Sequence, residues 1–165
     1  MEIRQTNQND LKSILKIYAS ARQFMLENGN PDQWGNRHPE KEVILSDIKN
    51  NHHFVCVDSN RLLGCFAFII GDDPTYEKII KGNWLDNNPY AVIHRIAVIE
   101  HGKGIGSYCI DWCFSQHNNI RVDTHKDNIP MQRLLKKKGF IYCGIICNSW
   151  GDERLAFQKI IKEES

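Results

Sequence analysis

The feature that most constrains this chain is a strand-like segment that runs into a glycine-rich turn and then into a helical pattern. Residues 90–99 (YAVIHRIAVI) are strongly strand-like, glycines stand at positions 102, 104 and 106, and helical spacing covers residues 107–117. Glycine lets the backbone adopt positive φ and approach a ligand closely. The free N–H groups of the helix's first turn then point at an anion, helped by the helix dipole. The pattern predicts a phosphate site, with Lys103 adding positive charge at its rim.

Two common phosphate-binding motifs fit this turn badly. A Walker loop needs Gly-Lys-Ser or Gly-Lys-Thr before its helix, whereas Lys103 is followed by Gly104. The dinucleotide fingerprint G-x-G-x-x-G also fails, because the glycines are spaced by two. A tight strand-to-helix connection without a ligand is the alternative for a lone glycine turn.

The rest of the chain predicts one mixed α/β domain over residues 1–165. Asn9 or Asp10 is expected to cap a first helix, which Gly29 and Pro31 end. Asn128 is expected to cap the last helix, which Gly139 ends. The predicted order is β-α-α-β-β-β-α-β-α-β-β, which corresponds to a mixed central sheet flanked by helices. Two further helices are expected at 40–49 and 107–117. The expected strands are 2–6, 54–57, 62–70, 90–99, 120–124, 140–147 and 154–161.

Composition argues against several classes of protein. Lys and Arg total 21 and Asp and Glu total 20, a balance that speaks against a dedicated nucleic-acid binder. The polar start and the lack of a long apolar run predict neither a signal peptide nor a membrane span. We therefore expect a cytoplasmic protein whose six cysteines are free, buried thiols without a metal.

The glycine turn and a later helix end together resemble a known family. The first pattern is a strand ending in Val, then Arg or Gln, two residues, Gly, any residue, and Gly or Ala. In this chain its positions are Val98, His101, Gly104 and Gly106. Asn128 and residues 134–140 (LLKKKGF) follow a second pattern, Asn and then Leu-Tyr-x-x-x-Gly-Phe. Both patterns are similar to those of the GNAT superfamily of acetyl-CoA-dependent N-acetyltransferases. His101 departs from the usual Arg or Gln, a tolerable change where backbone N–H groups make most pyrophosphate contacts.

The resemblance implies how acetyl-CoA is bound. The backbone of Ile96 and Val98 is expected to pair with the pantetheine arm as an extra strand, while the amides of the glycine turn hold the pyrophosphate. Asn128 is expected to face the pantetheine, although a plain helix cap is an equal alternative. The expected coenzyme-binding residues are Ile96, Ala97, Val98, His101, Gly102, Lys103, Gly104, Ile105, Gly106, Ser107 and Asn128.

Acetyl transfer to an amine needs a base, because only the neutral amine attacks. His94 is the first candidate for base or proton relay: by period two it is expected to share a strand face with Ile96 and Val98. A neutral core histidine is the alternative. Asp123 and His125 stand at a strand end beside the expected cleft and are candidates for relaying a proton or binding substrate. Loop hydration and capping are the structural alternatives to these roles.

Departures from the family pattern leave the acid open. Many relatives use a tyrosine to protonate the leaving thiolate, and this chain has Leu135 at that position. Tyr142 is a candidate replacement, with an ordinary strand aromatic as the alternative. Cys143 has no paired histidine visible in the sequence, so direct transfer is favoured over an acetyl-enzyme.

Three aromatic residues are expected to line the acceptor pocket. Trp34, Tyr76 and Trp84 stand in polar loops, and aromatic faces suit a cationic amine. Surface patches or the contacts of a homodimer explain them equally well. The sequence therefore predicts an N-acetyltransferase that moves an acetyl group from acetyl-CoA to a primary amine of a small molecule or peptide. A non-catalytic acyl-CoA sensor and an acyltransferase for longer chains remain alternatives.

Overall fold

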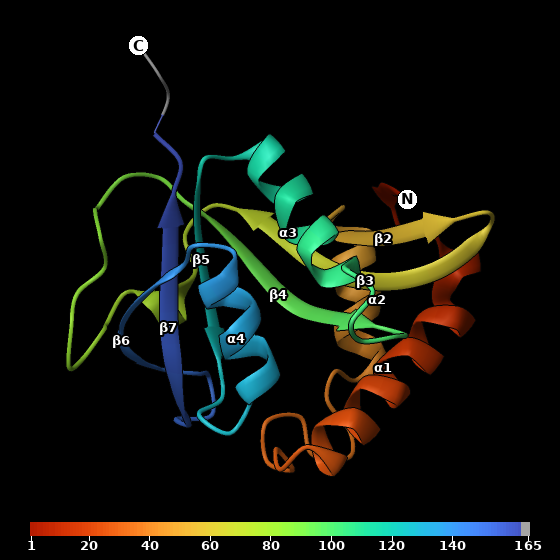
Figure 1. Ribbon diagram of the computed structural model, residues 1–165, viewed down its shortest axis with the longest axis horizontal. Coiled ribbons are helices and arrows are strands. Elements are labelled where there is room, and N and C mark those ends of the chain that lie inside the picture. Colours follow the sequence, from red (N-terminus) through yellow and green to blue (C-terminus); the bar gives the residue numbers. More distant parts are fainter. Residues whose placement is uncertain (163–165) are drawn as a thin grey trace.

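The computed structural model describes residues 1–162, which form a seven-stranded sheet with helices on both faces (Figure 1). The predicted domain extends to residue 165, and residues 163–165 lie outside the described part of the chain. The strands are β1 Glu2–Gln5, β2 His53–Asp58, β3 Arg61–Ile70, β4 Ala91–Val98, β5 Asn119–Thr124, β6 Ile141–Cys147 and β7 Glu153–Ile160, and the helices are α1 Leu11–Glu27, α2 Lys41–Lys49, α3 Ile105–Gln116 and α4 Ile129–Lys137, with short 3-10 turns η1 Gln8–Asp10 and η2 Pro74–Tyr76.

The predicted order of strands and helices is confirmed. Within the sheet the strands run β1-β2-β3-β4-β5-β7-β6. β4 and β5 are parallel, because α3 crosses over between them, and the other neighbouring strands are antiparallel. β2 and β3 form a tight hairpin, in which Ser59 and Asn60 both have the positive φ that such turns need.

The sheet divides the core into two layers. On one face, α3 and α4 pack Ile110 and Leu135 against Phe66 and Ile93. On the other face, α1 and α2 pack against strands β2 to β4 through a second apolar cluster. In Figure 1, α3 and α4 lie in front of the sheet. Both layers are apolar because each helix presents one buried stripe to the sheet.

A bulge in β4 changes which face its residues occupy. Cys65 of β3 opposes Ala97, but Ala67 opposes His94, so β4 carries an extra residue there. Arg95, at the bulge, has φ of 54°. As a result Ile96 and Val98 pack in the α3–α4 layer with Ile93, whereas His94 turns to the opposite face. The expectation that His94 shares a face with Ile96 and Val98 is therefore wrong, because an extra residue reverses the alternation.

β4 and β5 separate soon after they begin. Their pairing covers Ala91 with Ile120 and Val92 with Arg121, and the register ends there. From Ile93 onward, the edge of β4 that faces β5 pairs with no strand of the described part of the chain. An unpaired edge offers backbone N–H and C=O groups to an added strand.

Several local expectations need correction. Asp10 occupies the N-cap position of α1, but its side chain makes no capping hydrogen bond there. It instead forms a capping box with Asn7 around η1, where it accepts from the Asn7 backbone N–H, and it also accepts two hydrogen bonds from Arg4. α3 begins two residues before the expected start, at Ile105. All six cysteines are free, but Cys147 is exposed rather than buried. No helix within residues 1–162 combines the length and apolar character that crossing a bilayer requires.

Candidate active site

The glycine turn forms one end of a cavity of about 630 Å³ between α1, β4, α3 and α4. Gly104 caps α3 with φ of 76°, and no side chain accepts from the N–H groups of the helix's first turn. A Cβ at Gly102 or Gly104 would meet no atom within 4 Å, so the turn is open on its outer side. Free amides at a helix N-terminus, beside open space, fit a pyrophosphate.

Nearly all the expected coenzyme-binding residues border this cavity. Lys103 is exposed and does not line it, and His101 lies against it in an unexpected way. The His101 ring stacks on Phe24 of α1 with centroids 3.5 Å apart, and partial burial lowers its pKa. The lining members of the expected set are Ile96, Ala97, Val98, His101, Gly102, Gly104, Ile105, Gly106, Ser107 and Asn128.

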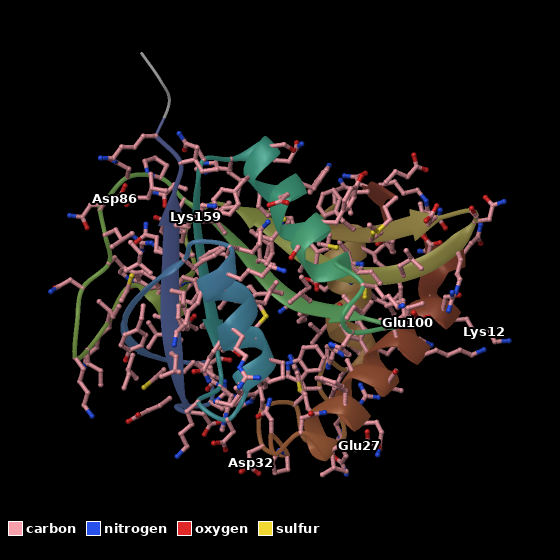
Figure 2. The ribbon with its side chains drawn as sticks, in the orientation of Figure 1. Lys12, Glu27, Asp32, Asp86, Glu100 and Lys159 are labelled. Atoms are coloured by element: carbon pink, nitrogen blue, oxygen red, sulfur yellow. The ribbon has the colours of Figure 1, made fainter. Side chains whose placement is uncertain are left out.

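A second cavity, of about 440 Å³, continues from the first. The two share Met25, Ile96, Asn128 and Met131, which mark the junction between them. The second cavity lies between β4, β5, the loop after α1 and the β6–β7 hairpin, and we call it the acceptor pocket. Figure 2 labels Glu100, near the glycine turn, and Asp32, in the loop after α1 that carries part of the acceptor pocket.

His94 projects into the acceptor pocket and is held by a carboxylate. Its Nε2 lies 2.7 Å from Oδ2 of Asp73, and its Nδ1 lies 3.9 Å from Oδ1 of Asp123. An ionised carboxylate only accepts hydrogen bonds, so Nε2–H donates to Asp73 and Nδ1 keeps its lone pair. In this tautomer Nδ1 is the acceptor nitrogen, and it faces Asp123.

The charges around His94 are set by hydrogen bonds. Burial favours the neutral form of Asp73, but hydrogen bonds from His94 and Thr75 outweigh it and lower the pKa of Asp73 to about 2. Asp123 accepts a 2.5 Å hydrogen bond from the Tyr76 hydroxyl. Burial and the nearby Asp123 raise the pKa of Tyr76 well above its usual value, so the phenol stays protonated and donates.

Asn128 caps α4 and also contacts the loop after α1. Its Oδ1 accepts from the backbone N–H of Met131, which makes it the cap of α4. Its side-chain nitrogen donates to Oε1 of Gln33 at 2.8 Å, across the junction of the two cavities. The cap fixes the side chain, and the contact with Gln33 ties α4 to the loop after α1.

The three aromatic residues expected at the acceptor pocket have different surroundings. Trp34 lines the pocket and lies edge-on to Tyr18. Tyr76 is buried and meets the site through its hydroxyl on Asp123. Trp84 lies behind Tyr76, donates to its carbonyl and packs against Arg121, away from both cavities. Although the sequence around Tyr76 and Trp84 is polar, both side chains belong to a third apolar cluster.

Two other candidate catalytic residues lie apart from His94. His125 borders a separate cavity with Arg154, and its Nδ1 accepts from the backbone of Asp127. Burial, reinforced by the positive charge of Arg154, lowers the pKa of His125. Tyr142 is half exposed on β6 and packs against Phe157. The structure brings neither of them to the acceptor pocket, because β6 is an edge strand and His125 turns back onto its own loop.

The structure adds pocket residues that the sequence analysis did not select. Asp73 is one of them, and its signal in the sequence is an acidic residue at the start of a Pro-Thr turn. The β6–β7 turn (NSWGDE) carries an exposed tryptophan, a signal for a binding loop. The added lining residues are Gln33, His38, Asp73, Asn148, Trp150 and Arg154.

The fold and these cavities together define a class of protein. A bulged strand, an open edge beside a diverging parallel strand, and a glycine turn at a helix N-terminus fit an extended, phosphate-bearing ligand. The model of the acetyltransferase (GNAT) family matches residues 13–140. This chain belongs to the GNAT family of acetyltransferases.

Solved structures agree with this membership. A GNAT-family acetyltransferase from Streptococcus agalactiae is 31% identical, with a TM-score of 0.90, over 98% of this chain and 96% of that one. A Staphylococcus aureus protein shares 24% identity, with a TM-score of 0.71, over 98% of this chain and 100% of that one. The Salmonella typhimurium protein yncA, solved with its cofactor acetyl-CoA, shares the fold at 17% identity and a TM-score of 0.62, over 99% and 95% of the two chains. A comparison with curated proteins found no match.

Proposed function

We propose that this protein transfers the acetyl group of acetyl-CoA directly to a primary amine of a small molecule or peptide. The observation that carries the proposal is His94 on the wall of the acceptor pocket, with Nε2–H held by Asp73 and Nδ1 directed toward Asp123. A base with a fixed tautomer beside a carboxylate suits the deprotonation of an ammonium group.

The first cavity fits the coenzyme. Its length runs from the glycine turn along the open edge of β4 to the junction with the acceptor pocket. The amides of residues 102–107 would hold the pyrophosphate, and the backbone of Ile96 and Val98 would pair with the pantetheine. Acetyl-CoA supplies an acyl group activated as a thioester, at the point where the two cavities meet.

The acceptor pocket suits a cationic amine. Asp73 and Asp123 are the carboxylates on its wall, and they attract an ammonium group into reach of His94. The ring of Trp34 adds an aromatic face. His94 Nδ1 takes the proton, Asp73 stabilises the resulting imidazolium through Nε2–H, and the Tyr76 hydroxyl keeps Asp123 in place.

Direct transfer is favoured because residues 1–162 offer no activated cysteine near His94. The Cys143 thiol is buried, its pKa is raised by that burial, and it donates to the carbonyl of Ile141. It borders neither cavity. A thiol of raised pKa away from the reacting groups does not form an acetyl-enzyme readily.

A non-catalytic acyl-CoA sensor is the second candidate, and Leu135 is the observation that favours it. Leu135 is fully buried in the core, so the position where many relatives carry a tyrosine supplies no hydroxyl. The sensor hypothesis predicts tight binding of acetyl-CoA with no transfer to any amine. An enzyme with a preference for longer acyl groups would instead transfer those groups faster than acetyl.

Steady-state acetylation of a broad amine panel tests the proposal. The His94→Gln variant should lose most of its turnover and the acidic limb of its pH–rate profile, with the affinity for acetyl-CoA retained. His52→Gln is the matched control, because His52 lies outside both cavities. An unchanged profile in His94→Gln would remove His94 from the mechanism, and binding of acetyl-CoA without transfer would favour the sensor.

A further inference from the structure

A buried arginine stands at the end of the acceptor pocket formed by the β6–β7 hairpin. Arg154 is only 8% exposed, and it lines the pocket near the start of β7. Its guanidinium donates to the backbone carbonyls of Glu153, at 3.0 Å, and Gln33, at 3.4 Å. Within residues 1–162 no carboxylate lies within 4 Å of its guanidinium, although Arg154 also lines a neighbouring cavity with Asp32 and Asp152.

The other positive groups of this pocket are already neutralised or uncharged. Arg95 makes two 2.8 Å hydrogen bonds to the carboxylate of Asp47. Burial, reinforced by neighbouring positive groups that include Arg154, lowers the pKa of His38 to about 4, so His38 is neutral near pH 7. Among the described lining residues, Arg154 is therefore the arginine whose charge remains available to a ligand.

The pocket thus has opposite charges on different walls. Asp73 and Asp123 surround His94 on the η2, β4 and β5 side, while Arg154 lies on the hairpin side. A buried arginine without a counter-ion is costly, because the charge has lost its hydration. A ligand anion would recover that free energy, and the planar guanidinium suits a carboxylate held by two hydrogen bonds.

We propose that the acceptor is a small amino-carboxylate, in which the amine lies between His94 and Asp123 and the carboxylate binds Arg154. This inference rests on the proposed acetyl transfer and narrows its substrate. The cavity of about 440 Å³ is in the range of pockets for small molecules. Acceptors with amines alone, such as polyamines, leave Arg154 unpaired and place a second positive charge near it.

Matched acceptors test this without altering the protein. Each free amino acid is compared with its carboxamide and with the amine formed by removing the carboxyl group. We expect kcat/KM to be higher for the free amino acid by about 10- to 100-fold, the range for a hydrogen bond to a charged group. Equal or better use of the carboxamide or the amine would overturn the amino-carboxylate inference while leaving acetyl transfer intact. No transfer to any member would overturn the proposed function itself.

The Arg154→Gln variant tests the residue. The preference for an amino acid over its carboxamide should fall toward one, and Arg154→Lys should restore part of it. Arg61→Gln is the control, because Arg61 is exposed and pairs only with Glu100 at the surface. A preference unchanged in Arg154→Gln would contradict the assignment. If that variant does not fold, the matched acceptors on the unaltered protein decide the question.

Discussion

Replacing Asp73 by Asn tests the electrostatics of the His94 site through protein stability. The carboxylate accepts from Nε2–H of His94 at 2.7 Å and from the hydroxyl and the backbone N–H of Thr75 at 2.7 and 2.9 Å. These bonds favour the ionised form and lower its pKa from 3.8 to about 2, against the opposing effect of burial. One pKa unit corresponds to about 1.4 kcal/mol, so the shift represents about 2 kcal/mol of folding free energy.

The sign of the pH dependence follows from the lowered pKa. A carboxyl whose pKa is lower in the folded state stabilises the fold above its unfolded pKa, 3.8, and loses that contribution as pH falls toward about 2. The Asn variant lacks this titration. The difference in unfolding free energy between the two proteins should therefore be about 2 kcal/mol near pH 6 and fall to about half of that by about pH 3.

Urea unfolding followed by tryptophan fluorescence at several pH values gives these free energies. The Asp72→Asn variant is the matched control, since Asp72 is exposed and adjoins Asp73 in the sequence. We expect Asp72→Asn to change the unfolding free energy by less than about 0.5 kcal/mol at every pH. A difference for Asp73→Asn that stays constant from pH 6 to pH 3 would refute the reasoning, because it would mean that the carboxylate is not stabilised by its hydrogen bonds.

Three further predictions concern the core and the two cavities. Gly104→Glu should abolish binding of acetyl-CoA in calorimetry, because the new side chain adds bulk and negative charge at the pyrophosphate site. Gly29→Glu is the control and should leave binding unchanged, because Gly29 has a similar positive φ but lies outside both cavities. Leu135→Ala should lower the unfolding free energy by about 2–5 kcal/mol because the side chain is fully buried, and Leu26→Ala, 58% exposed, should have little effect. Tyr76→Phe should raise the KM for the amine without changing the affinity for acetyl-CoA, because Asp123 loses its hydrogen bond; an unchanged KM would exclude this role for the hydroxyl.

The cavity beside the glycine turn was predictable because its determinants are local. A strand, a run of alternate glycines and a helix stand within one short segment. Gly102 and Gly104 adopt positive φ readily because glycine has no Cβ. The order of elements was predictable for the same reason, since apolar spacing and turn residues identify each strand and helix separately. Gly139, which ends α4 with φ of 87°, is another such local signal.

The acceptor pocket was less predictable because its residues come from distant segments. Asp73 follows β3, Arg154 begins β7, and Trp34 lies in the loop after α1, so only the folded sheet brings them to one cavity. His94 was selected as a base or proton relay partly for a strand face that the structure does not give it, and it nevertheless lines the acceptor pocket. Period two places it beside Ile96, and nothing in the segment HRI shows that the strand is bulged at Arg95.

The bulge in β4 connects the two cavities, and its position depends on buried polar contacts. Arg95 adopts a φ of 54°, which is unfavourable for a residue with a Cβ. Its guanidinium is held by Asp47 of α2, and its carbonyl accepts from the Tyr18 hydroxyl of α1 at 2.9 Å. These contacts offset the backbone strain and fix the extra residue at one place. With the bulge there, the strand beyond it keeps Ile96 and Val98 beside the coenzyme cavity, while His94 turns to the acceptor pocket. One irregular residue thus lets a single strand serve both cavities, and α1 and α2 take part in the site through the residue that they stabilise.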